Sequence, residues 1–264
     1  MPRRYGTASQ LIDELGISEP DEIDVEAIAQ YCAATIVYHP LNGCEARILG
    51  SADRAIITVN SNASVVRQRF SAGHELGHWM RDRGKTAFSC TEQTFYQEWQ
   101  GSSEGRANEF SAELLMPQKI FSKHARGKDI TFAAAIELAR VFRTSITATA
   151  IRLVQAGPLP AMMICTEKGL RKWFIRGSDI PESIWPRESP TAYTVAADLM
   201  KGKQVTTPNE IRADAWIDRR GSRNYFLIED SRSLGPTTIL TLLWWKNERQ
   251  LIDVTEEDES RDSR

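Results

Sequence analysis

The feature that most constrains this chain is a pair of histidines one helical turn apart, His74 and His78, in the pentapeptide His-Glu-Leu-Gly-His. Apolar residues recur at helical spacing from Ser64 to about Arg83, which predicts an amphipathic helix around the pentapeptide. Side chains four residues apart share a helix face, so two imidazoles can bind one metal ion. Glu75 between them is then placed to act on a water molecule rather than to bind the metal.

The sequence around this helix favours metal binding over a chance match on a solvent-exposed helix. Composition alone would give such a match in roughly one of several hundred sequences of this kind. Residues 55–60 predict a strand, and Asn60, Ser61 and Asn62 are candidate caps for the helix that follows. Zinc-dependent peptidases commonly have a helix that leaves a sheet in this way. Earlier in the chain, short helices are expected at 8–15 and 23–33, and a strand at 35–38.

A catalytic zinc site needs a third protein ligand, and the residues just after the histidine pair include no further histidine. Segment 104–117 predicts a second helix with one apolar face. At about 100° per residue, Glu104 lies at the edge of that face, whereas Glu109 and Glu113 point away from it. We therefore expect Glu104 to be the third ligand; the alternative is a first-turn carboxylate that only stabilises the helix dipole. Asn108, one turn later, is expected to orient a ligating imidazole.

Two motifs resemble those of a known family. The first runs from Arg69 to His78 and reads Arg-Phe-Ser-Ala-Gly-His-Glu-Leu-Gly-His. The second runs from Glu104 to Pro117 and reads Glu-x-x-Ala-Asn-x-Phe-Ser-Ala-x-Leu-Leu-Met-Pro. Many peptidases share the histidine pattern, but few pair it with the second motif at this distance. The chain resembles the ImmA/IrrE family of bacterial metallopeptidases over roughly residues 5–155.

The resemblance implies a zinc-dependent endopeptidase with a mainly helical, gluzincin-type zincin domain and a small sheet. It implies one Zn²⁺ per chain, bound by His74, His78 and Glu104, with Mn²⁺ as a substitute in vitro, and Glu75 as the catalytic base. Characterised members cleave a helix-turn-helix repressor of the XRE type and so release genes for stress and DNA-damage responses or for mobile-element transfer. An XRE-type repressor or an antitoxin is therefore the expected substrate and partner.

Composition predicts a cytoplasmic protein. A length of 264 residues with 41% hydrophobic residues leaves room for one large domain or two modest ones. The 4 cysteines stand far apart without a Cys-x-x-Cys pair, which predicts reduced thiols rather than a disulfide framework. The chain begins without an apolar segment behind its first charges, and no later run reaches bilayer-spanning length. Neither secretion nor membrane insertion is expected.

Residues 131–153 predict two helices with the outline of a helix-turn-helix. A DNA-reading helix usually presents basic and amide side chains, but the second of these helices offers mostly small neutral ones apart from Arg152. The formal net charge of −2 also argues against binding to phosphates. We expect the pair to serve packing and do not expect direct DNA binding.

The sequence changes character after Gly157. Residues 1–156 are predicted to form the peptidase domain, 157–254 a smaller α+β domain for sensing or substrate docking, and 255–264 a disordered acidic tail. Some members of the family have a GAF-like sensor in the second position. Strands are expected at 161–165, 172–175, 225–229 and 238–245, and a helix at 192–200. Five tryptophans are expected in the core, with a ligand pocket or docking groove as the alternative: Trp173, Trp185, Trp216, Trp244 and Trp245.

A second class of function stays open, in which the protein is a non-catalytic regulator with a structural metal site that binds DNA or a protein partner. Glu75 discriminates between the classes, because a structural zinc site has no use for a base and closes its coordination sphere with a fourth protein group. Tyr96, Arg106 and His124 have the chemistry to stabilise an oxyanion, but the sequence assigns none of them to the site. It also leaves open the cleavage site, the activating signal, any ligand of the second domain and the oligomeric state.

Overall fold

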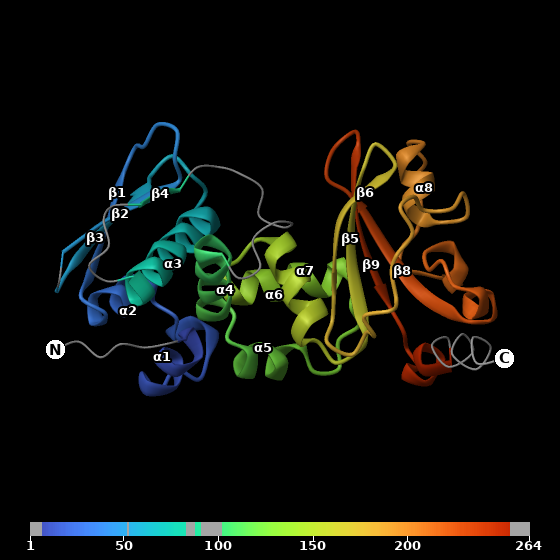
Figure 1. Ribbon diagram of the computed structural model, residues 1–264, viewed down its shortest axis with the longest axis horizontal. Coiled ribbons are helices and arrows are strands. Elements are labelled where there is room, and N and C mark those ends of the chain that lie inside the picture. Colours follow the sequence, from blue (N-terminus) through green and yellow to red (C-terminus); the bar gives the residue numbers. More distant parts are fainter. Residues whose placement is uncertain (1–6, 52, 83–87, 91–101, 254–264) are drawn as a thin grey trace. The chain divides into compact units, whose positions relative to one another are not determined.

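The fold is a mixture of helices and sheets, as the sequence predicts. Figure 1 shows helices together with two separate sheets, which makes the described part of the chain an α+β structure. The computed structural model describes residues 7–51, 53–82, 88–90 and 102–253. The predicted acidic tail and Tyr96 therefore lie outside the described residues.

The chain divides into two compact units whose segments interleave. The first unit comprises Met1–His124 and Ala139–Ala148, and the second comprises Ala125–Leu138 and Thr149–Arg264. Both helices of the pair predicted at 131–153 thus contribute residues to each unit. The sequence instead predicts a domain boundary after residue 156, and that boundary stays a prediction.

A four-stranded mixed sheet forms one layer of the first unit, with strand order β1-β3-β2-β4. β1 runs parallel to β3, while β2 pairs antiparallel with both β3 and β4. Alternate residues of β3 are buried, which gives the sheet one inward face. That face packs on helix α3 (Figure 1). The bounds are β1 Ala34–His39, β2 Ala46–Gly50, β3 Ala55–Asn60, β4 Phe88–Cys90 and α3 Val65–Asp82.

Side-chain caps explain where several of the surrounding helices begin. The Thr7 hydroxyl accepts a hydrogen bond from the Gln10 N–H at 3.3 Å, and Asp24 accepts one from the Ala27 N–H at 2.9 Å. The Ser102 hydroxyl does the same for the helix that carries Glu104, and Pro117 follows where that helix ends. The helices are α1 Ala8–Glu14, α2 Val25–Tyr31, α4 Ser103–Leu115, α5 Gln118–Ala125, α6 Phe132–Phe142 and α7 Ile146–Ala156, with a 3₁₀ turn at Pro20–Glu22.

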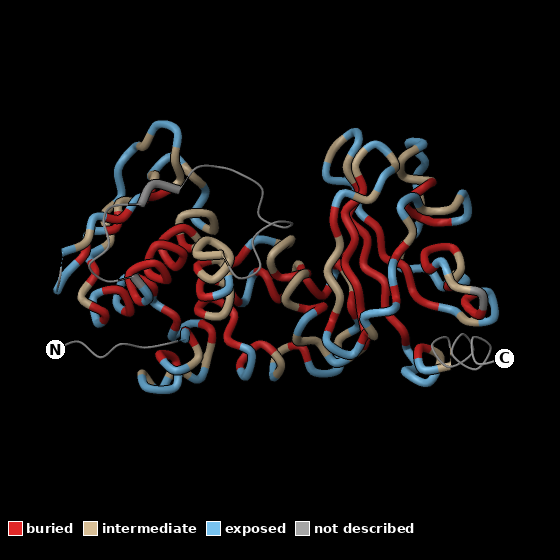
Figure 2. The backbone as a smooth tube through the Cα atoms, viewed as in Figure 1, coloured by how far each residue is buried: buried red, intermediate tan, exposed pale blue. Residues whose placement is uncertain are grey.

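Helix α3 is buried along most of its length. All residues from 71 to 80 are buried, and Figure 2 shows the helix as an almost continuous buried segment. A helix buried on every side is usually apolar throughout, yet this stretch contains His74, Glu75 and His78. Because burial of ionisable groups is costly, these side chains mark α3 as the part of the first unit where a function is expected.

The pair α6 and α7 has the predicted helix-turn-helix outline. The connection between the helices contains Arg143 in the left-handed region, with φ of 53°, and the Thr144 hydroxyl donates to the Met116 sulfur at 3.6 Å. On α7, Thr149 and Ala150 are buried. Two of the small neutral side chains on the second helix therefore pack in the interior.

The second unit contains a five-stranded antiparallel sheet of order β6-β5-β9-β8-β7. The first and last of its strands, β5 and β9, pair in the middle of the sheet. The predicted strands are present at or near their expected positions, while β7 is not anticipated by the sequence pattern. The bounds are β5 Ala161–Glu167, β6 Leu170–Arg176, β7 Asn209–Arg212, β8 Phe226–Ser233 and β9 Thr238–Trp244, with helix α8 at Val195–Met200 and 3₁₀ turns at Ala213–Ala215 and Arg220–Asn224.

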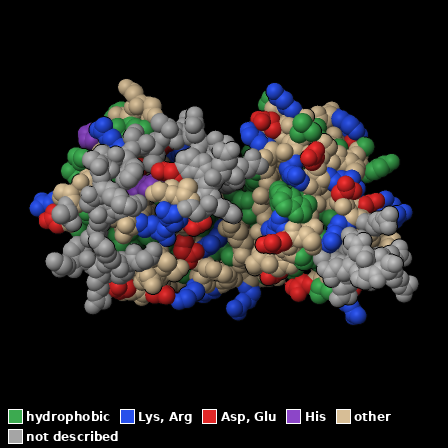
Figure 3. All heavy atoms as spheres, viewed as in Figure 1, with side chains coloured by type: hydrophobic (Ala, Val, Ile, Leu, Met, Phe, Trp, Pro, Cys, Tyr) green, Lys and Arg blue, Asp and Glu red, His purple; other side chains and the backbone are tan. Residues whose placement is uncertain are grey.

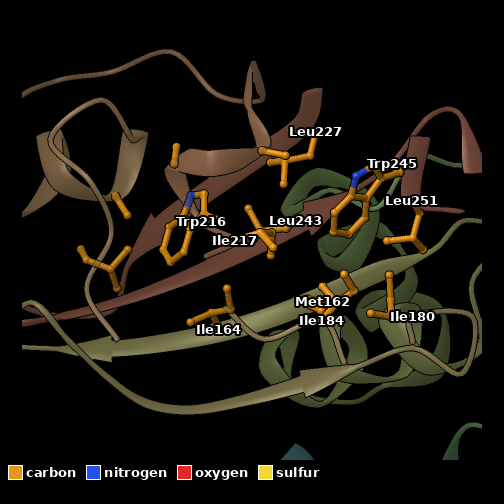
Figure 4. Close-up of a cluster of buried hydrophobic side chains, with 14 residues drawn as sticks. Met162, Ile164, Ile180, Ile184, Trp216, Ile217, Leu227, Leu243, Trp245 and Leu251 are labelled. Atoms are coloured by element: carbon orange, nitrogen blue, oxygen red, sulfur yellow. The ribbon is translucent and has the colours of Figure 1, made fainter. Parts of the chain in front are cut away.

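Four of the five tryptophans are buried, as expected for core residues. Trp216 and Trp245 lie in an apolar cluster with Met162, Ile164 and Leu243 (Figure 4). The other two buried tryptophans are Trp173 and Trp244. The expectation is wrong for one tryptophan, as the next paragraph describes.

The exposed tryptophan is Trp185, at 54% exposure. Its ring packs edge-on against Phe174, with 5.1 Å between ring centroids, and the Arg176 guanidinium lies 5.0 Å from the Trp185 ring. An aromatic ring in contact with a cation is stabilised at the surface, so strand-like spacing alone does not predict burial here.

Two adjacent acidic residues of β8 accept hydrogen bonds from backbone N–H groups at the N-termini of two helices. Successive side chains of a strand point to opposite faces of a sheet. Glu229 accepts hydrogen bonds from the Val195 and Ala196 N–H groups at the start of α8, at 3.1 and 2.8 Å. Asp230 accepts one from the Phe132 N–H at the start of α6, at 2.7 Å. Burial raises the pKa of Glu229 above its ordinary value, and the hydrogen bonds it accepts oppose that shift.

Within the described ranges, no helix combines the length and the apolar character that a bilayer crossing demands. Cys32 and Cys165 are buried and Cys44 is partly exposed, and all three are free thiols. Burial raises the pKa of the Cys165 thiol, which disfavours the reactive thiolate. The side chain of Cys90 lies outside the described part.

Candidate metal centre

Three predicted ligands converge where α3 faces α4. His74 and His78 come from successive turns of α3, and Glu104 comes from the first turn of α4. The Nε2 atom of His74 lies 3.2 Å from Glu104 Oε2, and that of His78 lies 3.2 Å from Glu104 Oε1. The two Nε2 atoms are 3.1 Å apart. One nitrogen from each ring and one carboxylate thus surround a single point.

Asn108 fixes the orientation and the tautomer of one imidazole. Its Oδ1 atom lies 2.8 Å from Nδ1 of His74. Because an amide oxygen can only accept, Nδ1 of His74 carries the proton in this hydrogen bond. In the neutral ring, Nε2 then has a lone pair, and this atom faces His78 and Glu104. Asn108 thus makes the hydrogen bond to His74 that its predicted role, orienting a ligating imidazole, requires.

The triangle of donor atoms fits a zinc ion. Tetrahedral zinc with bonds of about 2.0–2.1 Å keeps its ligand atoms roughly 3.3 Å apart. Here the two Nε2 atoms are 3.1 Å apart and each lies 3.2 Å from a different oxygen of the Glu104 carboxylate, and imidazole nitrogen with carboxylate oxygen is a donor set that zinc accepts. Within the described part of the chain, His74, His78 and Glu104 form the group of side chains able to hold a metal ion. Three protein ligands leave one tetrahedral position for a water or substrate.

Glu75 adds negative charge beside this triangle. It follows His74 on α3 and its exposed fraction is 0%. At about 100° per helical residue, its side chain leaves the helix about 60° around the axis from His78 and about 100° from His74. Burial of a carboxylate is costly unless positive charge or hydrogen bonds compensate, so a cation at the triangle would lower the cost of burying Glu75 and Glu104 together.

The comparison with protein families agrees with the motifs. Residues 29–154 match the family model described as the IrrE N-terminal-like domain, Peptidase_M78. This segment belongs to the ImmA/IrrE family. The resemblance predicted from the sequence motifs is thereby confirmed, and a metallopeptidase-like role follows from the family. The matched segment contains all the residues of the candidate metal centre.

Comparison with solved structures extends the likeness of the fold beyond that segment. A Mycobacterium tuberculosis transcriptional regulator is similar to this chain with a TM-score of 0.51 and 14% sequence identity. The likeness covers 89% of this chain and 73% of the other. At this identity it concerns the fold alone. No curated protein matches the sequence.

The remaining candidate residues of the ImmA/IrrE segment have other contacts. Glu113 accepts hydrogen bonds from Ser9 Oγ at 2.7 Å and from the Gln118 N–H at 3.1 Å, so it joins α1 to α4 and the start of α5. Glu109 is exposed, as the helical phase predicts. The His124 ring packs edge-on against Phe142, and its Nε2 lies 3.4 Å from Glu19 Oε2.

The close packing of α3 against α4 was not predicted from the sequence. Ser111 Oγ of α4 donates a hydrogen bond to the backbone carbonyl of Phe70 on α3, at 2.8 Å. Two glycines of α3, Gly73 and Gly77, lie against α4. The four-residue spacing of these glycines on the helix that carries the histidines is a sequence signal for this contact.

Proposed function

We propose that this protein is a zinc-dependent endopeptidase of the gluzincin type, with one zinc ion held by His74, His78 and Glu104. The observation that supports this most is the convergence of the two Nε2 atoms, 3.1 Å apart, on the Glu104 carboxylate, whose two oxygens each lie 3.2 Å from one of them. When bound, the ion would supply Lewis-acid polarisation of the scissile carbonyl group. Manganese is the expected substitute in vitro.

Glu75 is the general base of the proposed reaction. Its carboxylate takes a proton from the attacking water and delivers it to the nitrogen of the leaving amine, which breaks the peptide bond. Its place on α3 between the two histidines and its complete burial support this role. Asn108 Oδ1 accepts a hydrogen bond from the Nδ1–H group of His74 and so keeps the Nε2 lone pair directed at the metal position.

The test uses Glu75→Gln in the full-length protein loaded with zinc. The variant keeps its metal-binding side chains but lacks the base, so we expect bound zinc at the wild-type level and no cleavage of the substrate. Glu109→Gln, which changes an exposed carboxylate of α4, is the matched control and should cleave like the wild type. A Glu75→Gln protein with full activity would end the enzyme hypothesis.

The proposed substrate is an XRE-type repressor or an antitoxin, whose cleavage would release stress-response or mobile-element genes. Membership of the ImmA/IrrE family supports this substrate. Incubation of the zinc-loaded protein with candidate repressors encoded beside it, followed by mass spectrometry, tests it. One outcome would contradict the proposed substrate but not the peptidase activity. In that outcome the repressors stay intact, while a generic unfolded protein is cleaved by the wild type and not by Glu75→Gln.

Residues 157–254, which belong to the second unit, are proposed to form the GAF-like sensor or substrate-docking module. Its sheet has an apolar core of its own, which supports a module with its own role (Figure 4). The cytoplasm is the proposed compartment, and the free thiols Cys32, Cys44 and Cys165 are in keeping with it.

A DNA-binding regulator is the second candidate function, favoured by the description of the structural neighbour as a transcriptional regulator. Against it, Lys and Arg side chains are interspersed with Asp and Glu on the described surface that Figure 3 shows, and the formal net charge is −2. A gel-shift experiment at low salt separates the candidates. A salt-sensitive shift with the chain's own promoter DNA favours the regulator, and no shift at low salt removes it.

A further inference from the structure

Helices α3 and α4 touch through two glycines on α3 and through Ala107, Phe110 and Ser111 on α4. A Cβ atom built on Gly73 would lie 2.7 Å from Ser111 Oγ and 3.4 Å from Ser111 Cβ. A Cβ atom on Gly77 would lie 3.1 Å from Phe110 Cβ and 3.2 Å from the Cα atom of Ala107. The separations of 2.7, 3.1 and 3.2 Å are shorter than ordinary van der Waals contacts. The two helices are therefore as close as these two glycines allow.

The residues that make these contacts lie next to the residues of the metal centre on both helices. Each glycine immediately precedes a histidine of the centre, so the pairs are Gly73 with His74 and Gly77 with His78. On α4, Ala107 lies three residues after Glu104, and Ser111 lies three residues after Asn108. Residues three apart share a helix face. The surface that meets the glycines is thus the one that presents the carboxylate and the amide to the imidazoles.

We propose that Gly73 and Gly77 are positioning residues for the metal centre: they set the distance between α3 and α4 at which Glu104 completes the triangle with the two histidines. This inference rests on the proposed metal site and adds a determinant of its affinity. A metal site tolerates ligand displacements of about 0.2 Å, whereas an added methyl group must move a helix or its neighbours by several tenths of an ångström. The Ala107 Cα atom and the Phe110 Cβ atom, which face Gly77, cannot move aside without a shift of the α4 backbone.

A rescue experiment tests the contact at Gly73. We expect Gly73→Ala to weaken Zn²⁺ binding on the order of tenfold or more, because the new methyl group meets Ser111 Oγ, which the hydrogen bond to the Phe70 carbonyl holds in place. Ser111→Ala removes the atom that lies 2.7 Å away and leaves a Cβ at 3.4 Å, so the double variant should recover most of the lost affinity. Ser111→Ala alone, which loses only the bond to Phe70, should weaken binding less than Gly73→Ala.

Zn²⁺ affinity is measured on the full chain by competition with a chromophoric chelator, and Co²⁺ absorption reports the coordination geometry independently of catalysis. Gly77→Ala should lower affinity too, since its new methyl group meets Ala107 backbone. Gly235→Ala is the matched control, because nothing lies within 4 Å of a Cβ atom added there, and its affinity should equal that of the wild type. Thermal unfolding without metal shows whether each variant is folded.

The outcomes separate this inference from the proposed function. If folded Gly73→Ala and Gly77→Ala bind Zn²⁺ as tightly as the wild type, the positioning role is wrong while the metal site stands. If Gly73→Ala is weakened or unfolded and Ser111→Ala does not restore it, the contact at Ser111 is not the cause and the inference is also wrong. If the wild type itself binds no Zn²⁺, the proposed function fails first. Alanine is favoured over glycine in helices, so weaker binding cannot be ascribed to helix propensity.

Discussion

At the scale of single residues, the hydrogen bond between Asn108 and His74 has the clearest consequence. Asn108→Ala removes the acceptor that fixes the His74 tautomer, and we expect the affinity for Zn²⁺ to fall by roughly 10–100-fold. Asn108→Asp keeps an oxygen acceptor and should lose much less. Chelator competition measures both. Equal affinities for Asn108→Ala and wild type would show that the 2.8 Å contact does not support the ligand.

Glu229 gives a prediction about pH, and its sign follows from its environment. Burial raises the pKa of Glu229 above the ordinary value of 4.5, so the folded protein holds this proton more tightly than the unfolded chain. The resulting stabilisation is complete below the ordinary pKa and is lost as pH rises through the raised pKa. Relative to Glu229→Gln, which cannot ionise, the wild type should therefore become less stable as pH increases above 4.5.

Chemical denaturation of both proteins over a pH series measures that difference in the free energy of unfolding. Below the ordinary pKa of glutamate the difference should be constant, since the group is protonated in both states. A wild type that gains stability relative to Glu229→Gln on raising the pH would contradict the predicted direction. Because Ser231 Oγ also donates to Glu229, Ser231→Ala should enlarge the effect by removing a bond that favours the carboxylate.

At the scale of secondary-structure elements, β8 stabilises α6 through a cap that is remote in sequence. Asp230→Ala leaves the Phe132 N–H and the Thr207 hydroxyl without the carboxylate that accepts from both. We expect a loss of about 0.5–2 kcal/mol in the free energy of unfolding, the range for loss of a helix cap. Asp230→Asn keeps one carbonyl oxygen and should lose less. Denaturant titration measures the difference. An Asp230→Ala variant with the free energy of unfolding of the wild type would show that water replaces the cap.

Sequence patterns predicted the elements with strong periodicity and missed the weak ones. The face of α4 follows from its spacing alone, and the buried residues are those that the phase indicates: Ala107, Phe110, Ser111, Leu114 and Leu115. β2 and β7 were not predicted, because β7 has Ile211 as its one apolar residue and β2 contains Arg47 and ends at Gly50, so neither is typical of a strand. Their pairing partners supply the hydrogen bonds that stabilise them, and sequence does not reveal those partners.

The same distinction applies to the candidate centre. His74 and His78 share a helix, so their proximity follows from one periodicity, and helical phase selects Glu104 among the acidic residues of α4. The distance between the two helices is a tertiary property. It depends on Gly73 and Gly77 meeting Ser111 and Ala107, so it could not be read from either helix separately. The contact of Glu113 could not be predicted from helical phase either, because its hydrogen-bond partner Ser9 lies 104 residues away in the sequence.

At the scale of the whole molecule, the interleaved units predict how the chain responds to truncation. Residues 125–138 and 149–156 belong to the second unit, so a fragment that ends at residue 156 keeps them without the sheet they pack with. We expect this fragment to unfold at a lower temperature than the full chain and to aggregate, because it exposes apolar side chains of α6 and α7. Thermal unfolding and light scattering measure both. A fragment as stable as the full chain would favour the boundary predicted from the sequence.

The long-range cap of α6 also orders events during synthesis. Phe132 and Asp230 are 98 residues apart, so the ribosome makes the start of the helix well before the carboxylate that caps it. The histidine pair and Glu104 are made earlier still. A nascent chain thus contains every proposed zinc ligand while the first turn of α6 still relies on water and on Thr131, whose hydroxyl accepts from the Ala134 N–H. Only after β8 has been translated can Asp230 accept the hydrogen bond from the Phe132 N–H and stabilise that turn.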